Sequence, residues 1–178
     1  MAKSMSVSWI DLLFPGVVVH EAAHALACYA CGVKVHTISV HRSSGMVVHD
    51  KTSARASLLI GLFPLIVGGG VAIALFQYAS RTQADSPLLS LLLLWIGFSV
   101  AFHAIPSTQD VQNIVTSTER RFGEMWKGPR NIFTKLLKSG GYAIAWIGSW
   151  FLLVVAMLAN ATILTRIALG IGLLLASG

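Results

Sequence analysis

Long apolar stretches separate the polar parts of this chain, and their length limits the folds that it can adopt. A helix that crosses a lipid bilayer needs about 20 consecutive, mainly apolar residues. Four stretches meet this requirement, residues 8–31, 55–79, 88–106 and 142–164. Only 11% of the 178 residues are charged, whereas a water-soluble domain carries about 25%. We therefore expect an all-α polytopic membrane protein with about four transmembrane helices in a single domain, residues 1–178.

The two longest polar segments have regular patterns of their own. In the loop of residues 32–54, β-branched residues lead into the turn-forming sequence Arg-Ser-Ser-Gly and then into Met-Val-Val. This order predicts a small cytoplasmic β-hairpin after the first span. In the loop of residues 107–141, apolar side chains recur at helical spacing, which predicts amphipathic helices. The second of these, from Ile132 onward, is expected to lie along the membrane surface.

The residues after Asn160 admit more than one arrangement. One helix over residues 142–178 would be about 55 Å long, which is longer than a bilayer is thick. Residues 161–178 therefore extend the fourth helix, form a half-span or lie at the membrane interface. The sequence leaves these three alternatives open.

The distribution of Lys and Arg predicts the orientation of the chain. Ten of these 13 residues lie in or at the edge of the loops 32–54 and 107–141. The positive-inside rule therefore places both loops in the cytoplasm and both termini outside. The net charge of +6 does not indicate nucleic-acid binding, because apolar spans separate the basic residues. We expect an integral protein of a prokaryotic cell membrane, with the lipid bilayer and no nucleic acid as a partner.

The sequence His20-Glu21-Ala22-Ala23-His24 lies inside the first apolar stretch. Two histidines four residues apart project from one face of a helix, so that both rings can bind one Zn²⁺ ion. Glu21 lies one residue away from that axis, where its carboxylate can act on water without binding the metal. Ionisable side chains are costly inside a membrane span, so their concentration here indicates a functional site.

A catalytic Zn²⁺ ion normally has three protein ligands, and the end of the third apolar stretch offers two candidates for the third. Pro106 breaks that helix, so we expect Asp110 to fold back toward the metal on non-helical backbone. The alternative role of Asp110 is to cap a helix that starts at Val111. His103 is the rival third ligand, or else a hydrogen-bond donor at the reaction centre.

Cys28 and Cys31 are the only cysteines of the chain. We expect them to pack as small hydrophobic residues; the alternatives are a redox pair or an accessory metal ligand. The two cysteines share one helical stripe with the two histidines. A non-enzymatic membrane metal transporter or sensor that uses this stripe is therefore the alternative function.

The segment from Phe14 to Ala25 resembles the site-two protease family of intramembrane zinc metalloproteases, and the end of the third span, with Pro106 and Asp110, is similar to a second motif of that family. The resemblance covers residues 8–115. The first motif is specific and the second is looser. The family usually has an asparagine where this chain has His103, and its Leu-Asp-Gly is here Gln-Asp-Val, with the aspartate one residue early. These departures are typical of a divergent, minimal member.

The resemblance implies a role for each candidate site residue. His20, His24 and Asp110 would hold one Zn²⁺ ion, and Glu21 would be the catalytic glutamate. His103 would be a second catalytic residue that hydrogen-bonds the substrate carbonyl or oxyanion. The expected function is an intramembrane zinc endopeptidase that cleaves membrane-spanning protein substrates near the cytoplasmic face. A catalytically silent scaffold of the same fold is a third class.

Overall fold

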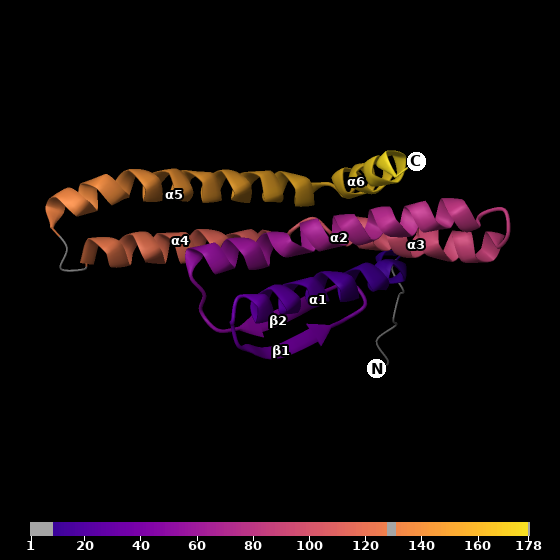
Figure 1. Ribbon diagram of the computed structural model, residues 1–178, viewed down its shortest axis with the longest axis horizontal. Coiled ribbons are helices and arrows are strands. Elements are labelled where there is room, and N and C mark those ends of the chain that lie inside the picture. Colours follow the sequence, from indigo (N-terminus) through magenta and orange to yellow (C-terminus); the bar gives the residue numbers. More distant parts are fainter. Residues whose placement is uncertain (1–8, 128–130, 178) are drawn as a thin grey trace, which may run out of the picture.

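The structure is a computed structural model that describes residues 9–127 and 131–177. These residues form a mainly helical protein with one small sheet (Figure 1). The elements follow one another in the order η1 (Trp9–Leu13), α1 (Phe14–Ala30), β1 (Val35–Val40), β2 (Gly45–His49), α2 (Ala54–Thr82), α3 (Pro87–His103), α4 (Thr108–Lys127), α5 (Ile132–Ala161) and α6 (Ile163–Ala176).

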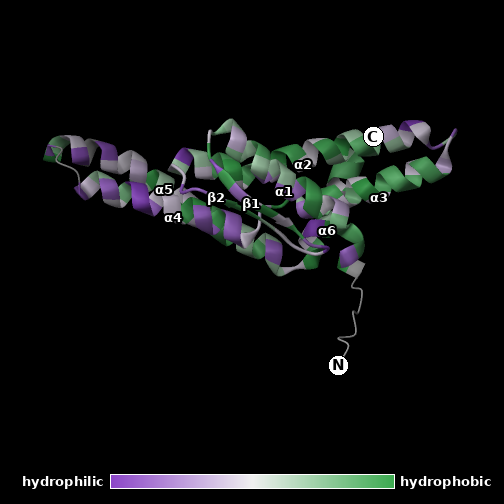
Figure 2. Cartoon of the chain, turned by 90° about the horizontal axis from the view of Figure 1, so that it is seen from below, coloured by the Kyte–Doolittle hydropathy of each residue, from purple (hydrophilic) through white to green (hydrophobic). Residues whose placement is uncertain are grey.

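Four helical segments are long and apolar enough to cross a membrane, Ile10–Ala30, Ala54–Thr82, Pro87–Lys127 and Ile132–Ala161. The third of these joins α3 and α4, whose compositions differ. Hydrophobic residues cover most of α2 and α3, whereas hydrophilic residues recur along α4 (Figure 2). The prediction of four apolar helices of membrane-spanning length is therefore confirmed.

The predicted β-hairpin is present between α1 and α2. Strands β1 and β2 pair antiparallel, with Val40 opposite Gly45 at the turn. At the open end of the hairpin, the ring of His36 lies 2.7 Å from a carboxylate oxygen of Asp50. This hydrogen bond lowers the pKa of the Asp50 carboxyl below its ordinary value. The prediction of a short hairpin after the first helix is confirmed.

The segment from Ile132 onward is not a separate helix but the first part of a long one. Helix α5 has 30 residues and runs without a break from Ile132 to Ala161. The segment from Ile132 and the predicted fourth span thus form one helix. Gly140 and Gly141, which lie between them, weaken a helix but keep its backbone hydrogen bonds, so they do not interrupt it. Helix α5 runs beside α4 over much of its length (Figure 1). The predicted chain restart at Gly128-Pro129 lies outside the described residues.

The C-terminal residues turn away from α5 and form a separate helix. Thr162 has extended backbone angles, φ −127° and ψ 139°, and ends α5 three residues before the expected limit of the fourth span. Helix α6 then packs across α3, where Gly170 lies so close to Phe98 that an added Cβ would come within 2.7 Å of the ring. Of the three alternatives, a simple extension of the fourth helix is wrong.

Helices α1 and α3 approach each other closely at Gly16. The backbone N–H of Gly16 donates to Ser99 Oγ at 2.8 Å, and this hydroxyl donates to the carbonyl of Leu13 at 2.5 Å. A Cβ at Gly16 would collide with the Ser99 carbonyl and come within 2.6 Å of the His103 ring. This close packing places the middle of α1 against the end of α3, where the candidate site lies.

Candidate metal centre

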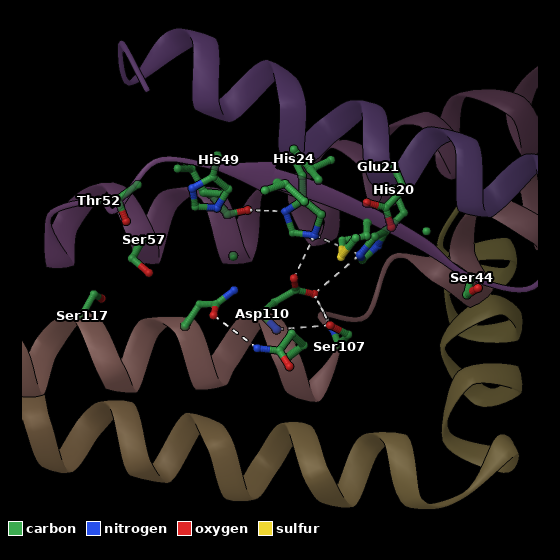
Figure 3. A pocket seen from close by; sticks show the side chains of 18 of the residues that line it. His20, Glu21, His24, Ser44, His49, Thr52, Ser57, Ser107, Asp110 and Ser117 are labelled. Atoms are coloured by element: carbon green, nitrogen blue, oxygen red, sulfur yellow. Dashed lines mark hydrogen bonds and ion pairs between the residues drawn. The ribbon is translucent and has the colours of Figure 1, made fainter. Parts of the chain in front are cut away.

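Two histidines of α1 face each other across one turn of the helix (Figure 3). The Nε2 atoms of His20 and His24 are 3.0 Å apart. Their rings contact edge to face, with 4.7 Å between the centroids. The four-residue spacing thus brings both rings to one point, as expected for positions i and i+4 of a helix.

Backbone carbonyls of two other helices orient these rings. The Nδ1 atom of His20 lies 2.6 Å from the carbonyl oxygen of His103, at the end of α3. The Nδ1 atom of His24 lies 2.9 Å from the carbonyl oxygen of Ile60, in α2. A carbonyl only accepts hydrogen bonds, so each Nδ1 carries the proton. When neutral, each ring then presents the lone pair of Nε2, as metal-binding histidines do.

Pro64 explains why the Ile60 carbonyl is open to His24. Within an α-helix the carbonyl of residue 60 accepts the N–H of residue 64, and proline has no N–H to give. Pro64 lies buried inside α2. The Ile60 carbonyl therefore has no helical N–H donor, and it accepts a hydrogen bond from Nδ1 of His24 instead.

Asp110, in the first turn of α4, completes a cluster with the two histidines. Its Oδ1 atom lies 3.1 Å from His24 Nε2, and its Oδ2 atom lies 3.6 Å from His20 Nε2. One ligand atom from each of the three residues lies within 4.8 Å of the others. In the part of the chain that the structure describes, no other group of three or more His, Cys, Asp or Glu residues is arranged in this way.

The spacing of these atoms fits a tetrahedral metal ion. Zn²⁺ binds His nitrogens and carboxylate oxygens at about 2.0–2.2 Å, which puts two ligand atoms about 3.3 Å apart at a tetrahedral angle. The three closest approaches here are 3.0, 3.1 and 3.6 Å. Two imidazoles and one carboxylate are also a donor set that catalytic zinc sites use.

Asp110 also takes part in the N-terminal cap of α4. Its Oδ2 atom accepts hydrogen bonds from the N–H and the hydroxyl of Ser107, at 2.7 and 2.6 Å. Its own N–H donates to Ser107 Oγ at 3.2 Å. This reciprocal pair is a capping box. Two expectations are thus wrong: the helix begins at Thr108 and not at Val111, and Asp110 lies on helical backbone.

Glu21 lies beside the cluster but outside it. Its side chain is only 5% exposed and lines the same cavity as the two histidines. The backbone of Gly45, at the start of β2, is so close that a Cβ there would collide with the Glu21 side chain. Glycine at this position thus allows the hairpin to close over Glu21.

The His103 ring is not positioned as a third metal ligand. Its ring donates from Nδ1 to the Ser99 carbonyl at 3.0 Å, and its backbone carbonyl holds His20. The His103 ring lines the cavity and is not part of the three-residue cluster. With its proton on Nδ1, the neutral ring offers only an acceptor at Nε2, so it can donate to an oxyanion only when protonated.

A cavity of about 660 Å³ opens from the cluster toward the hairpin. Residues of α1, of β2 and the segment after it, of the start of α2 and of α4 form its walls. Strand β2 lines this cavity along its whole length, whereas no residue of β1 does. Among residues 9–127 and 131–177 the sheet has two strands, so the edge of β2 that faces away from β1 has no strand partner there.

The two cysteines lie apart from the cluster. Cys28 is fully buried and packs with Ala27 and Ile60, and Cys31 contacts the same group. Both are free cysteines. Their surroundings agree with the expectation that they pack as small hydrophobic residues.

Several residues that shape the site were not singled out from the sequence. The motif Ser107-x-x-Asp110 is a readable capping box, and Pro64 is a readable sign of a free carbonyl four residues earlier. Asn160 and Arg166 have no such local sign. Asn160 donates to the Pro106 carbonyl at 3.0 Å, and Arg166 donates to the Phe102 carbonyl at 3.3 Å.

Comparisons with protein-family models, with curated proteins and with solved structures find no significant match to this chain. The resemblance to the site-two protease family therefore rests on the residues quoted above and stays a prediction.

Proposed function

We propose that this protein is an intramembrane zinc endopeptidase that hydrolyses peptide bonds of membrane-spanning protein substrates. The observation that carries the proposal is the convergence of His20, His24 and Asp110, with a buried glutamate beside them. Three protein ligands leave one position of a tetrahedral ion to water or substrate, as catalytic zinc sites do and structural ones do not.

Zn²⁺ held by these three residues would supply a Lewis acid that acidifies water and polarises a peptide carbonyl. Glu21 would accept a proton from the attacking water and pass it to the nitrogen of the leaving amine. Its place in the cavity wall, next to His20 and under Gly45, suits this role. The His103 ring faces the same cavity and, when protonated, would hydrogen-bond the substrate carbonyl.

We further propose that the four apolar helices are inserted in a lipid bilayer. The start of α1, the α2–α3 turn and α6 lie toward one end of the structure, and α4 and α5 extend to the other (Figure 1). The hairpin and α4, which carry many of the basic residues, would lie on the cytoplasmic side by the positive-inside rule. The cavity would then admit water and substrate from the cytoplasm.

The unpaired edge of β2 is the proposed binding site for the substrate. A transmembrane helix hides its peptide bonds, so the segment to be cut must unwind, and an extended segment can add to an open strand edge. Strand β2 runs from Gly45, over Glu21, along the cavity wall. An added strand would therefore pass close to the metal cluster.

Proline substitutions test this binding mode. Neighbouring N–H groups of a strand point to opposite edges, so proline is placed in turn at Met46 and Val47 of β2. We expect one of the two variants to lose at least about tenfold in cleavage rate, because one lost hydrogen bond costs about 1 kcal/mol and the substrate also shifts. Zinc content, measured in parallel, should not change.

The matched control places proline at Ile38 and Ser39 of β1, which does not line the cavity. Equal losses in β1 and β2 variants, or no loss in either β2 variant, would contradict substrate addition to β2.

The whole proposal is tested by removing and restoring the metal. The protein, purified in detergent, is incubated with a set of single-span substrates before and after treatment with a zinc chelator. We expect about one zinc per chain, cleavage that falls by more than about 100-fold without metal, and recovery on addition of Zn²⁺. Cleavage that persists in metal-free protein would overturn the proposal.

The alternative of a metal transporter or sensor depends on Cys28 and Cys31 as ligands. Their packing among Ala27 and Ile60, away from the histidine pair, gives no observation in its favour.

A further inference from the structure

The break between α3 and α4 carries two groups that shape the proposed metal site. The His103 carbonyl orients His20, and Ser107 fixes Asp110 through the capping box. Only residues 104–107 separate the two helices. Both one ligand and the orientation of another therefore depend on the path of this short segment.

The break leaves backbone carbonyls without helical donors. The carbonyl of Phe102 would pair with the N–H of residue 106, which is a proline and has none. The carbonyl of His103 would pair with the N–H of Ser107, which donates instead to Asp110. The N–H of Asp110, which would pair with the carbonyl of Pro106, donates to Ser107 Oγ. Buried carbonyls of this kind need other donors.

Two residues from the α5–α6 junction supply donors to the carbonyls on either side of His103. Arg166 donates to the Phe102 carbonyl at 3.3 Å and lies over the Phe102 ring, 5.4 Å from its centroid. Asn160 donates from Nδ2 to the Pro106 carbonyl at 3.0 Å. The Oδ1 atom of Asn160 accepts a hydrogen bond from Arg166, so the two side chains act as one unit.

We infer that Asn160 and Arg166 are positioning residues, which set the geometry of the metal centre by holding the α3–α4 break at the carbonyls of Phe102 and Pro106. The inference rests on the proposed function, because it takes the cluster to be a metal site. Planar guanidinium and amide groups suit the role, since each offers several donors at fixed angles. A cation among apolar helices needs such partners.

A chain of hydrogen bonds connects the α5–α6 junction to the proposed metal site. Arg166 and Asn160 fix the segment between Phe102 and Pro106, and this segment carries the carbonyl that holds His20. Changes to groups that orient metal-binding histidines usually weaken metal binding by about 10- to 100-fold. The same size of effect is expected here, although neither residue is a ligand.

The test measures metal binding itself. Arg166→Gln, Asn160→Asp and the double variant are purified in detergent beside the wild type, and the Kd of Zn²⁺ is measured by competition with a chelating dye. The visible absorption of bound Co²⁺ reports the geometry of the site. Arg81→Gln is the control, because Arg81 is an exposed arginine in the last turn of α2.

We expect each single variant to raise the Kd by about 10- to 100-fold and to change the Co²⁺ spectrum. The double variant should lose less than the product of the two single effects, because both residues act on one segment. Arg81→Gln should bind as the wild type does. Far-UV circular dichroism identifies variants that do not fold. If Arg166→Gln does not fold, Asn160→Asp alone tests the inference, because aspartate is nearly equal in size to asparagine.

Folded variants with a Kd within about twofold of the wild type and an unchanged Co²⁺ spectrum would overturn the inference and leave the proposed metal site intact. A wild-type protein that binds neither Zn²⁺ nor Co²⁺ would overturn the proposed function, which separates the two failures.

Discussion

Glu21→Gln is expected to abolish proteolysis while the protein keeps its zinc. Glutamine has nearly the same size as glutamate but cannot accept a proton from water at neutral pH. General acid–base catalysis contributes about 10²–10⁴-fold to a rate, so the cleavage rate should fall by that factor. Glu21 is outside the three-residue cluster, and zinc per chain, measured by elemental analysis, should therefore match the wild type.

Glu124→Gln is the matched control, because Glu124 is exposed on α4 and pairs with the neighbouring Arg120 and Arg121. It should cleave at the wild-type rate. If Glu21→Gln kept full activity with zinc bound, the assignment of Glu21 as the proton acceptor would be wrong. Loss of zinc together with activity would mean instead that Glu21 contributes to metal binding.

Asp110→Asn should remove the metal. Asparagine keeps an oxygen that can accept from Ser107, so the cap of α4 is largely preserved, but it lacks the charge that favours Zn²⁺. The Kd of Zn²⁺ should rise by more than the 10- to 100-fold that is typical of changes outside the ligands, and cleavage should fall with it. Equilibrium dialysis against zinc buffers measures the Kd.

His103→Gln separates the two candidates for the third ligand. The ring of His103 is not part of the cluster, and its backbone carbonyl, which holds His20, survives the substitution. Zinc binding should therefore stay within a few-fold of the wild type. Asp85→Asn, in the exposed α2–α3 turn, controls for the loss of a carboxylate. Zinc retained in Asp110→Asn and lost in His103→Gln would show that the ligand assignment is reversed.

Local patterns predicted most of the fold. Apolar length indicated the four long helices, and the run of β-branched residues indicated the hairpin, because both depend on neighbours in sequence. The spacing of His20 and His24 predicted their shared face, which the structure has. The role of Pro106 as a helix breaker also followed from the residue alone, since α3 ends at His103.

The parts that were not predicted depend on contacts distant in sequence. The end of α5 at Thr162 was not predicted; there the Thr165 hydroxyl donates to the carbonyl of Ala159, which has lost its helical donor at the break. Pro64 marks the Ile60 carbonyl as lacking its helical donor, but no residue near it shows that this carbonyl faces His24. Asp110 was assigned two competing roles, and in the structure its two oxygens allow it to cap α4 and to face the histidines at once.

The bracing of the α3–α4 break by the α5–α6 junction has a consequence for how the protein matures. A chain is made from its N-terminus, and its segments fold as they emerge. The histidine pair would enter the membrane with the first helix, well before Asn160 and Arg166 are synthesised. Until these two residues dock, the α3–α4 break lacks the hydrogen bonds that they donate to the carbonyls of Phe102 and Pro106. Under the proposed function, the nascent chain would therefore stay inactive toward neighbouring membrane proteins until its later helices are in place.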